Sequence, residues 1–288
     1  MNLTQLDTPL QMLDTSYYDG RHEVSGQWLY EPIDWSQAKT RWKAVIIKQG
    51  QGLNIDPLFS LQFRAAEGHA LRGIYHYFSS GHNAIASAHS AADAAESAGG
   101  YGELGVFLDL EKNPSNLDGA TYLRNVASWL FEMEKRMGNF GSEAPLCIYT
   151  RASFWNPLFA QAGNPKWPAK YPVWAAGYPY DKRDDFEEKY QAVLSGQPVT
   201  DRPTMPKGFK TLLAWQWTEK GKPSDIPGYP PFKKSVDMNL LFFGLVTGPP
   251  EAPVPVPSLG EAAIRLDELL RLQALIEDYI KARREELS

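Results

Sequence analysis

Two carboxylates stand two residues apart where an apolar segment of the chain ends. Asp109 and Glu111 follow Val106–Leu108, and Gly102 and Gly105 precede that run. An apolar run after turn residues predicts a buried β-strand, in which residues two apart project from the same face, about 7 Å apart. Each acid then disfavours ionisation of the other, so one is held protonated near neutral pH. A protonated acid beside an ionised one is the arrangement that cleavage of a glycosidic bond uses.

The same spacing has an ordinary structural interpretation, and the spacing alone leaves both open. An Asp-x-Glu pair also ends strands, caps helices and forms ion pairs. Motifs for other kinds of catalysis do not occur in the sequence. The five histidines lack the spacing of metal ligands. There is no glycine-rich phosphate-binding loop and no Gly-x-Ser-x-Gly element, the motif of a serine nucleophile. The one cysteine, Cys147, lies in the apolar run Leu146–Tyr149, as a buried structural thiol would. We therefore expect no metal and no cofactor.

Segments with the composition of buried strands recur along the chain. They are residues 11–16, 44–48, 73–78, 106–110, 146–149, 173–176, 212–217 and 236–241, and helical spacing is clearest over 57–68, 83–98 and 119–137. Strands that alternate with helices predict parallel βαβ units, and eight units predict a barrel with its active site at the carboxyl ends of the strands. We expect an α/β fold, an irregular TIM-like β/α barrel of eight strands and fewer than eight helices. An open doubly wound sheet is the alternative.

Two long loops and a proline-rich boundary complete the organisation. The loops, over 18–32 and 181–209, either border a groove or decorate the surface. Residues 247–258 read TGPPEAPVPVPS, which is typical of an extended linker. We predict a barrel domain over 1–245, a linker over 246–258 and an amphipathic C-terminal helix over 259–288. The apolar residues of this helix recur every three or four positions, so it should bury them on the barrel, against copies of itself or on another protein.

The composition argues for some classes of partner and against others. The net charge is −5 with no basic stripe, which argues against nucleic acid, and no apolar run reaches the ~18 residues of a membrane span. Nine Trp and 14 Tyr are many for 288 residues, and exposed aromatic rings stack on sugars, which makes carbohydrate a candidate ligand. Residues 1–9 lack the basic start and apolar core of a secretory signal peptide. We therefore expect a protein made in the cytoplasm that reaches any outside substrate by another route.

Over residues 13–243 the chain resembles glycoside hydrolase family 25, the Chalaropsis-type lysozymes. The resemblance is carried by short motifs in the family's order: LDTSYY at 13–18, IDW at 33–35, VIIK at 45–48, GIYHYF at 73–78, LDLE at 108–111, IYT at 148–150, WAAGY at 174–178, WQW at 215–217 and VDMN at 236–239. The chain departs from the family at 50–52, where Thr-Glu-Gly is common, and at Trp217, where Tyr is common. The segment after Tyr18 is also longer than usual.

The resemblance implies roles for four acids. Glu111 would be the general acid that protonates the leaving glycosidic oxygen. Asp109 would stay ionised and orient a 2-acetamido group whose carbonyl attacks C1, an exception to the usual two-carboxylate scheme. Direct inversion through a water is the alternative, and it stays open. Asp14 and Asp237 would lie in the same groove, hydrogen-bond the sugar and set the electrostatics around Glu111.

The resemblance also implies a set of aromatic substrate-binding residues, with core packing as the alternative for each. They are Tyr75, Tyr77, Tyr149, Trp174, Tyr178, Trp215 and Trp217. Strand alternation places Tyr75 and Tyr77 on one face and His76 on the other, where we assign the histidine a structural role. Gln216 likewise faces away from both neighbouring tryptophans.

The activity implied by the resemblance is that of an N-acetylmuramidase. Such an enzyme cuts the β-1,4 bond between N-acetylmuramic acid and N-acetylglucosamine in bacterial peptidoglycan, without a cofactor. We expect a phage or prophage lysin, released through a holin or carried on the virion. Three other classes stay open: a chitinase-like enzyme, a catalytically silent sugar-binding barrel, and a virion structural protein whose C-terminal helix is its main functional part.

Overall fold

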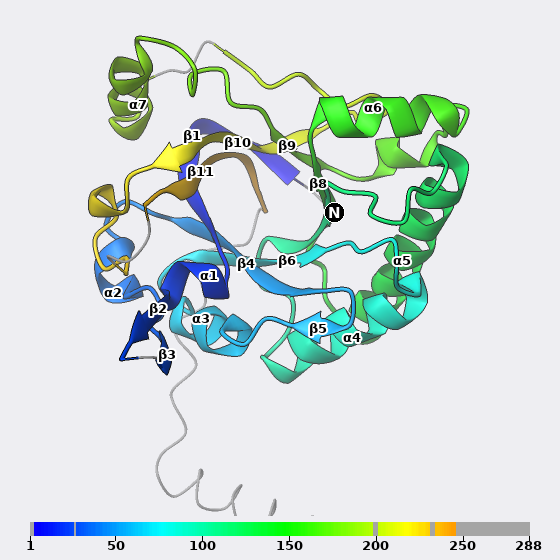
Figure 1. The fold of residues 1–288 in the computed structure, drawn as a ribbon, viewed down its shortest axis with the longest axis horizontal. Coiled ribbons are helices and arrows are strands. Elements are labelled where there is room, and N and C mark those ends of the chain that lie inside the picture. The colour runs from blue at the N-terminus through cyan, green and yellow to red at the C-terminus, as the bar shows by residue number, and fades with distance from the viewer. Residues whose placement is uncertain (1–2, 26, 198–200, 231–233, 246–288) are drawn as a thin grey trace, which may run out of the picture. The chain divides into compact units, whose positions relative to one another are not determined.

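Figure 1 shows the fold in a computed structural model, which describes residues 3–25, 27–197, 201–230 and 234–245. The linker predicted over 246–258 and the helix predicted over 259–288 lie outside these residues, so both stay predictions. Among the helices of the described ranges, none is long and apolar enough to cross a membrane.

Eight strands close into a barrel, and each of the eight predicted segments forms one of them. In spatial order they are β1 (Leu3–Thr15), β11 (Val236–Leu245), β10 (Leu212–Gly221), β9 (Val173–Ala176), β8 (Leu146–Thr150), β7 (Gly105–Leu110), β6 (Leu71–Tyr77) and β4 (Ala44–Gln51). Parallel pairing of β1 with β4 closes the ring, and the short β5 (Asn54–Ile55) lies beside β4. The predicted irregular β/α barrel is confirmed, and the alternative of an open sheet is wrong.

One strand runs against the others. β11 is antiparallel to both β1 and β10, whereas the other neighbours in the ring pair in parallel. The expectation of parallel units throughout was therefore wrong at this strand. The physical reason is the connection from β10, whose described part carries only the 3₁₀ helix η2 (Pro223–Asp225). A parallel neighbour is usually reached through a crossover α-helix, and the described part of this connection contains none.

Seven α-helices lie in the described ranges, in agreement with the prediction of fewer than eight. They are α1 (Tyr17–Gly20), α2 (Trp35–Ala38), α3 (Phe59–Ala65), α4 (Ala84–Ser97), α5 (Gly119–Asn139), α6 (Ala152–Gln161) and α7 (Phe186–Leu194), with a 3₁₀ helix η1 at Trp167–Lys170. The predicted helical segments 57–68, 83–98 and 119–137 contain α3, α4 and most of α5. Figure 1 shows α4, α5 and α6 side by side on one flank, and α5 packs against both of the others.

The two predicted loops contain regular structure. The segment 18–32 holds a hairpin of β2 (Arg21–Val24) and β3 (Gln27–Tyr30), and 181–209 holds α7. Sequence patterning missed both because four-residue strands and a nine-residue helix with three buried side chains are too short to show a clear hydrophobic periodicity.

Alternation along the strands creates two apolar layers. Residues such as Met12, Phe107 and Cys147 fill the barrel interior, and residues such as Leu108 and Trp129 pack between the barrel and its helices. Cys147 is fully buried, and burial raises the pKa of its thiol, which matches the structural role expected for it. Side chains that continue the inner layer to the carboxyl end of the barrel are therefore the ones that can form a site.

Candidate active site

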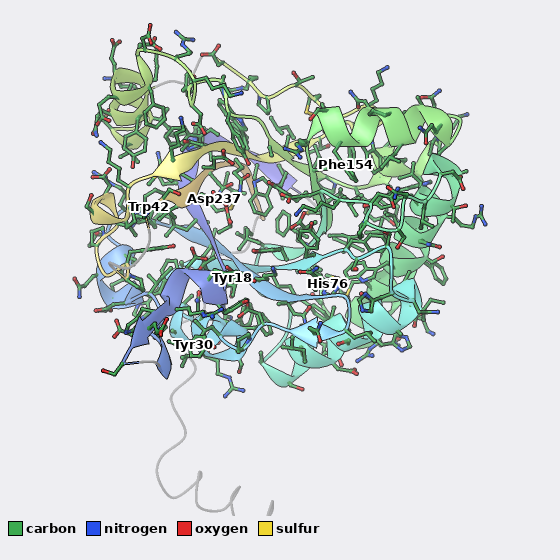
Figure 2. The ribbon with its side chains drawn as sticks, in the orientation of Figure 1. Tyr18, Tyr30, Trp42, His76, Phe154 and Asp237 are labelled. Atoms are coloured by element: carbon green, nitrogen blue, oxygen red, sulfur yellow. The ribbon has the colours of Figure 1, made fainter. Side chains whose placement is uncertain are left out.

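Polar side chains continue the inner layer at one end of the barrel and enclose a cavity of about 310 Å³. Nine of the predicted site residues line it: Asp14, Tyr75, Tyr77, Asp109, Glu111, Tyr149, Trp174, Tyr178 and Asp237. Most belong to the carboxyl ends of parallel strands. Asp237 stands at the beginning of β11, and because β11 runs the opposite way, its beginning lies at the same rim. Figure 2 labels Asp237 and Tyr18, which line this cavity from β11 and α1.

Asp109 is the buried member of the Asp-x-Glu pair. In the sheet register its backbone lies between those of Tyr77 on β6 and Tyr149 on β8, and Glu111 follows the end of the strand, half-buried. The Oδ1 atom of Asp109 is buried and has no hydrogen-bond partner among the described residues. This atom is therefore an acceptor that a ligand in the cavity can use.

Burial raises the pKa of Asp109 well above the usual value for aspartate, and the charges of Glu111 and Asp14 raise it further, while Lys48 lowers it. Burial therefore opposes the ionised form that the resemblance implies for Asp109, and that role stays a prediction. The physical reason is depth, because Asp109 lies at the bottom of the cavity and loses more hydration than a residue at the rim.

Asp14 is held by two amide side chains. Its Oδ2 accepts hydrogen bonds from Asn239 Nδ2 at 2.7 Å and from Gln216 Nε2 at 3.1 Å. Burial raises the pKa of Asp14, and the charge of Asp237 raises it further, whereas the two hydrogen bonds lower it. Asp14 thus joins strands β1, β10 and β11 at the cavity floor.

The same amides orient the aromatic residues of the cavity. Gln216 Oε1 accepts hydrogen bonds from Tyr149 at 2.7 Å and from Tyr178 at 2.5 Å. Asn239 Oδ1 accepts from Trp174 Nε1 at 2.9 Å. Each ring therefore has a fixed direction, which is the pre-organisation that a binding site needs.

Lys48 is the one cation among the residues that line this cavity. Its Nζ lies 5.9 Å, 6.0 Å and 5.5 Å from the ring centroids of Tyr18, Tyr75 and Tyr77. The sequence held a signal for it, because Ile46 fills the barrel interior and a residue two positions on faces the same way.

His76 has the structural role that alternation predicted. Its Nδ1 lies 2.7 Å from Gln49 Oε1, its Nε2 lies 2.8 Å from Ser87 Oγ, and its ring stacks on Trp129 at 5.5 Å. Burial lowers the pKa of His76 to about 3, with a smaller contribution from Lys48. The imidazole is therefore neutral and fully engaged outside the barrel wall.

Two predicted substrate contacts were wrong. Trp215 and Trp217 are fully buried in the layer outside the barrel wall. Trp215 Nε1 donates to the Gly177 carbonyl at 2.7 Å, and Trp217 packs on Tyr190 of α7 with ring centroids 5.7 Å apart. The physical reason is strand alternation: Gln216, between them, is the residue that faces the cavity.

The resemblance assigned no role to five further lining residues: Ser16, Tyr18, Lys48, Gln216 and Glu219. Together with the predicted acids they give the cavity five carboxylates and one cation. Despite this acidity, no group of three or more His, Cys, Asp or Glu side chains within the described ranges is arranged to hold a metal ion.

Two further cavities share lining residues with this one. A cavity of about 570 Å³ shares Tyr178, and a cavity of about 520 Å³ shares Tyr18 and Lys48. Tyr178 follows β9 and Lys48 lies on β4, which are on opposite sides of the ring. The three cavities therefore follow one another across the end of the barrel, an arrangement that suits a chain-like ligand.

A sequence model of the family described as "Glycosyl hydrolases family 25" matches residues 28–226, more than half of the chain. The chain belongs to glycosyl hydrolase family 25. Among its relatives, the uncharacterized protein YegX of Escherichia coli O6:H1 is 32% identical over 54% of this chain and 55% of YegX. Lysozyme M1 of Streptomyces globisporus is 25% identical over 76% of this chain and 65% of the lysozyme. This family 25 chain thus spans less than two thirds of either relative.

A bacterial lysozyme from Streptomyces coelicolor has a similar structure. The TM-score is 0.57 at 24% identity, and the match covers 82% of this chain and 93% of the lysozyme. At this identity the likeness establishes the fold, which is the irregular barrel of family 25.

Proposed function

We propose that this family 25 domain is a peptidoglycan hydrolase of the N-acetylmuramidase type. The observation that carries the proposal is the Asp109–Glu111 pair, which opens into a cavity that Asp14 and Asp237 also line. Membership of a glycosidase family and the names of two similar proteins, both called lysozymes, support the same reaction. The bond cut would be the β-1,4 bond between N-acetylmuramic acid and N-acetylglucosamine.

Glu111 is the general acid in this proposal. It stands half-buried at the cavity rim, beyond the last residue of β7, whereas Asp109 lies deeper. A rim position lets Glu111 give its proton to the leaving oxygen of a glycan that lies across the cavity, and later recover a proton from water.

Asp109 assists the 2-acetamido group. Its unpartnered Oδ1 accepts the N–H of that group, whose carbonyl oxygen bonds to C1 as the bond from C1 to the leaving oxygen breaks. Water then opens the cyclic intermediate and gives a proton to Glu111, so the product keeps its anomeric configuration. Lys48 and the positive charge of the intermediate both favour the ionised form of Asp109 that accepts this hydrogen bond.

The aromatic wall positions the sugar. Tyr149 and Trp174 lie with ring centroids 4.4 Å apart, and Tyr75 approaches Trp174 at 6.5 Å. Burial raises the pKa of Tyr75 and Tyr149, so both hydroxyls keep their protons. Because the net charge of the chain is −5, shape and aromatic contact must supply more of the affinity for an anionic wall than overall charge does.

The test is digestion of purified peptidoglycan by the wild type and by Glu111→Gln, followed by mass spectrometry of the released fragments. We expect fragments with reducing-end N-acetylmuramic acid from the wild type and their loss in the variant. Proton NMR of the first product then reports its anomer, and an inverted product would replace the substrate-assisted route by direct attack of water. Intact glycan after treatment with folded wild type would contradict the proposal and favour a sugar-binding barrel.

A further inference from the structure

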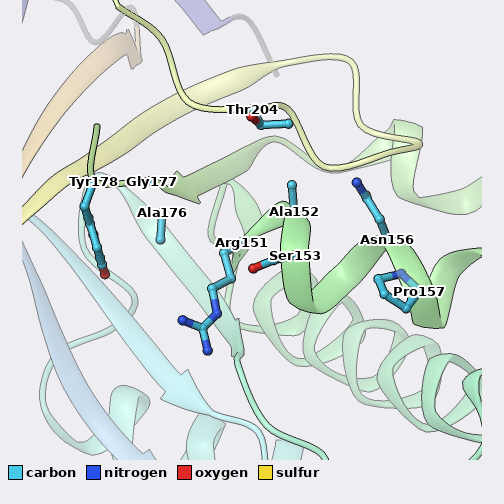
Figure 3. Close-up of a pocket in the computed structure, with 9 residues that line it drawn as sticks. All are labelled: Arg151, Ala152, Ser153, Asn156, Pro157, Ala176, Gly177, Tyr178 and Thr204. Carbon is cyan, nitrogen blue, oxygen red and sulfur yellow. The ribbon is translucent and has the colours of Figure 1, made fainter. Parts of the chain in front are cut away.

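The cavity next to the reaction site has a different chemical character. It measures about 570 Å³ and is formed by the beginning of α6, the residues that follow β9, and Thr204 (Figure 3). Arg151 is the one charged residue among those that line it, and no carboxylate does. The reaction cavity beside it has five carboxylates and one lysine. A ligand that spans both cavities therefore meets an acidic surface and then a cationic one.

Arg151 is placed to meet such a ligand. It follows the last residue of β8, two positions after Tyr149, which lines the reaction cavity. The side chain is exposed and makes no hydrogen bond or ion pair with any described residue. Figure 3 shows Arg151 and Tyr178 extending in the same direction, each from a neighbouring strand end. Its planar guanidinium thus keeps all its donors for a partner, and the group that matches this fork is a carboxylate or a phosphate.

Two polar side chains beside Arg151 add to the same surface. Ser153 is exposed and lines the cavity. Asn156 uses its Oδ1 to accept a hydrogen bond from the Lys207 backbone N–H at 2.8 Å, which leaves its Nδ2 group as a donor. The surface is therefore rich in donors and lacks a competing acid, which suits an anion better than a neutral sugar.

We propose that this Arg151 pocket binds a carboxylate carried on the 3-O-lactyl side of N-acetylmuramic acid: that of the lactyl group itself where no peptide is attached, and one on the peptide where the lactyl group is amidated. This inference rests on the proposed function and names the part of peptidoglycan that the groove recognises. In that polymer every second sugar carries a lactyl group, whose free carboxylate or attached peptide supplies the negative charge. The acidic reaction cavity repels a carboxylate, and the adjoining guanidinium attracts it, so the two cavities together fix the register of the glycan. A cavity of about 570 Å³ also has room for several peptide residues.

Three substrates separate the sources of the carboxylate. The first is intact peptidoglycan, and the second is glycan strands treated with an amidase so that each lactyl group carries a free carboxylate. The third is the same stripped strands with those carboxylates coupled to methylamine, which makes them neutral. Arg151→Gln removes the charge, Arg151→Lys keeps it without the planar fork, and Arg124→Gln is the matched control on the exposed surface of α5.

We expect Arg151→Gln to lower kcat/KM on carboxylate-bearing strands about tenfold, chiefly through KM. The ratio of kcat/KM on charged strands to kcat/KM on neutral strands should then fall toward one. Arg151→Lys should keep part of that ratio, and Arg124→Gln should keep all of it. A loss on stripped strands assigns the contact to the lactyl carboxylate itself. A loss confined to intact peptidoglycan assigns it to the peptide.

Two results would overturn the inference: an equal loss on charged and neutral strands, or no loss on either charged substrate. Failure of the proposed function is detected separately by measuring Kd for the same strands with Glu111→Gln, with and without Arg151→Gln. Charge-selective binding that depends on Arg151 supports the pocket even if the wild type cuts nothing. Binding that ignores the carboxylate contradicts the pocket even if the wild type is an active hydrolase.

Discussion

At the scale of single residues, the site places its acids at different depths. Asp109 and Asp14 lie on the cavity floor with raised pKa values, because burial disfavours their charged forms. Glu111 and Asp237 stand closer to the rim, each half-buried. This difference in depth matches the separate roles proposed for Glu111 and Asp109, one exchanging a proton with the leaving group and the other contacting a fixed part of the substrate.

The buried carboxyl of Asp109 lowers the stability of the protein at neutral pH. Its folded pKa exceeds the ordinary value of 3.8, so folding is favoured by the proton. The stability gained from this proton is fully present below pH 3.8, the ordinary value, and is lost as the pH rises through the folded pKa. Asp109→Asn should therefore raise Tm by a few degrees at neutral pH, and the gain should vanish toward pH 3.8. Thermal unfolding followed by circular dichroism over a pH series measures it.

Asp118→Asn is the control with the opposite sign. The Asp118 side chain caps α5 by accepting a hydrogen bond from Thr121 N at 3.0 Å, and hydrogen bonds to Thr121 lower its pKa. Its ionised form stabilises the fold above its unfolded pKa, so the variant should show no gain at neutral pH. A neutral-pH gain of equal size in both variants would mean that general charge reduction, and not the burial of Asp109, is the cause.

The acids could be predicted from sequence, whereas two tryptophans could not. Asp109 and Glu111 are polar residues where an otherwise apolar run ends, so their position at a strand end is visible in the sequence. Trp215 and Trp217 lie in a strand that is buried on both faces, by the barrel interior on one side and by α7 and its neighbours on the other. Hydrophobicity does not distinguish two buried faces, so only the polar Gln216 marked the inner one.

At the scale of elements, the strands were predictable and their directions were not. Each of the eight is a short apolar run bounded by polar or turn residues, a local signal. The direction of β11 depends on the connection before it, which no local pattern describes. That reversal brings Asp237, at the start of its strand, to the rim where the other strands end. The one antiparallel strand of the barrel thus supplies one of the four acids predicted from the sequence.

Replacing Trp217 or Trp174 by Phe should separate an effect on the stability of the fold from an effect on substrate binding. Trp217→Phe removes buried volume against Tyr190 of α7 and no hydrogen bond, since Trp217 Nε1 has no partner among the described residues. It should cost roughly 0.5–3 kcal/mol of stability and leave kcat/KM near that of the wild type. Trp174→Phe removes the donor to Asn239 Oδ1 and should lower kcat/KM about tenfold. Denaturant unfolding and steady-state kinetics measure the two effects.

Either of two results would contradict this assignment of Trp217 to packing and Trp174 to binding. A loss of activity in folded Trp217→Phe, at unchanged stability, would return this tryptophan to the substrate groove. An active Trp174→Phe would mean that the link from Trp174 through Asn239 to Asp14 does not position the acid.

At the scale of the whole molecule, the barrel supplies the surface on which the proposed chemistry depends. The described residues account for a groove, its acids and its cationic neighbour. The route by which the protein would reach a cell wall, and an origin in a phage or prophage, stay predictions. The same is true of residues 259–288, whose apolar spacing predicts a helix that buries one face.

If this helix buries its apolar face against copies of itself, the protein has the mass of an oligomer in solution. Leu266 and Leu269 fall on the apolar stripe, so charged substitutions there should abolish self-association through the helix without altering the barrel. We expect light scattering to give a multiple of 32.3 kDa for the wild type and the monomer mass for the Leu266→Glu, Leu269→Glu variant. Glu268→Gln is the control, because it changes a charge outside the stripe. Monomer masses for all three proteins would remove self-association and leave docking on the barrel or on another protein as the use of this face.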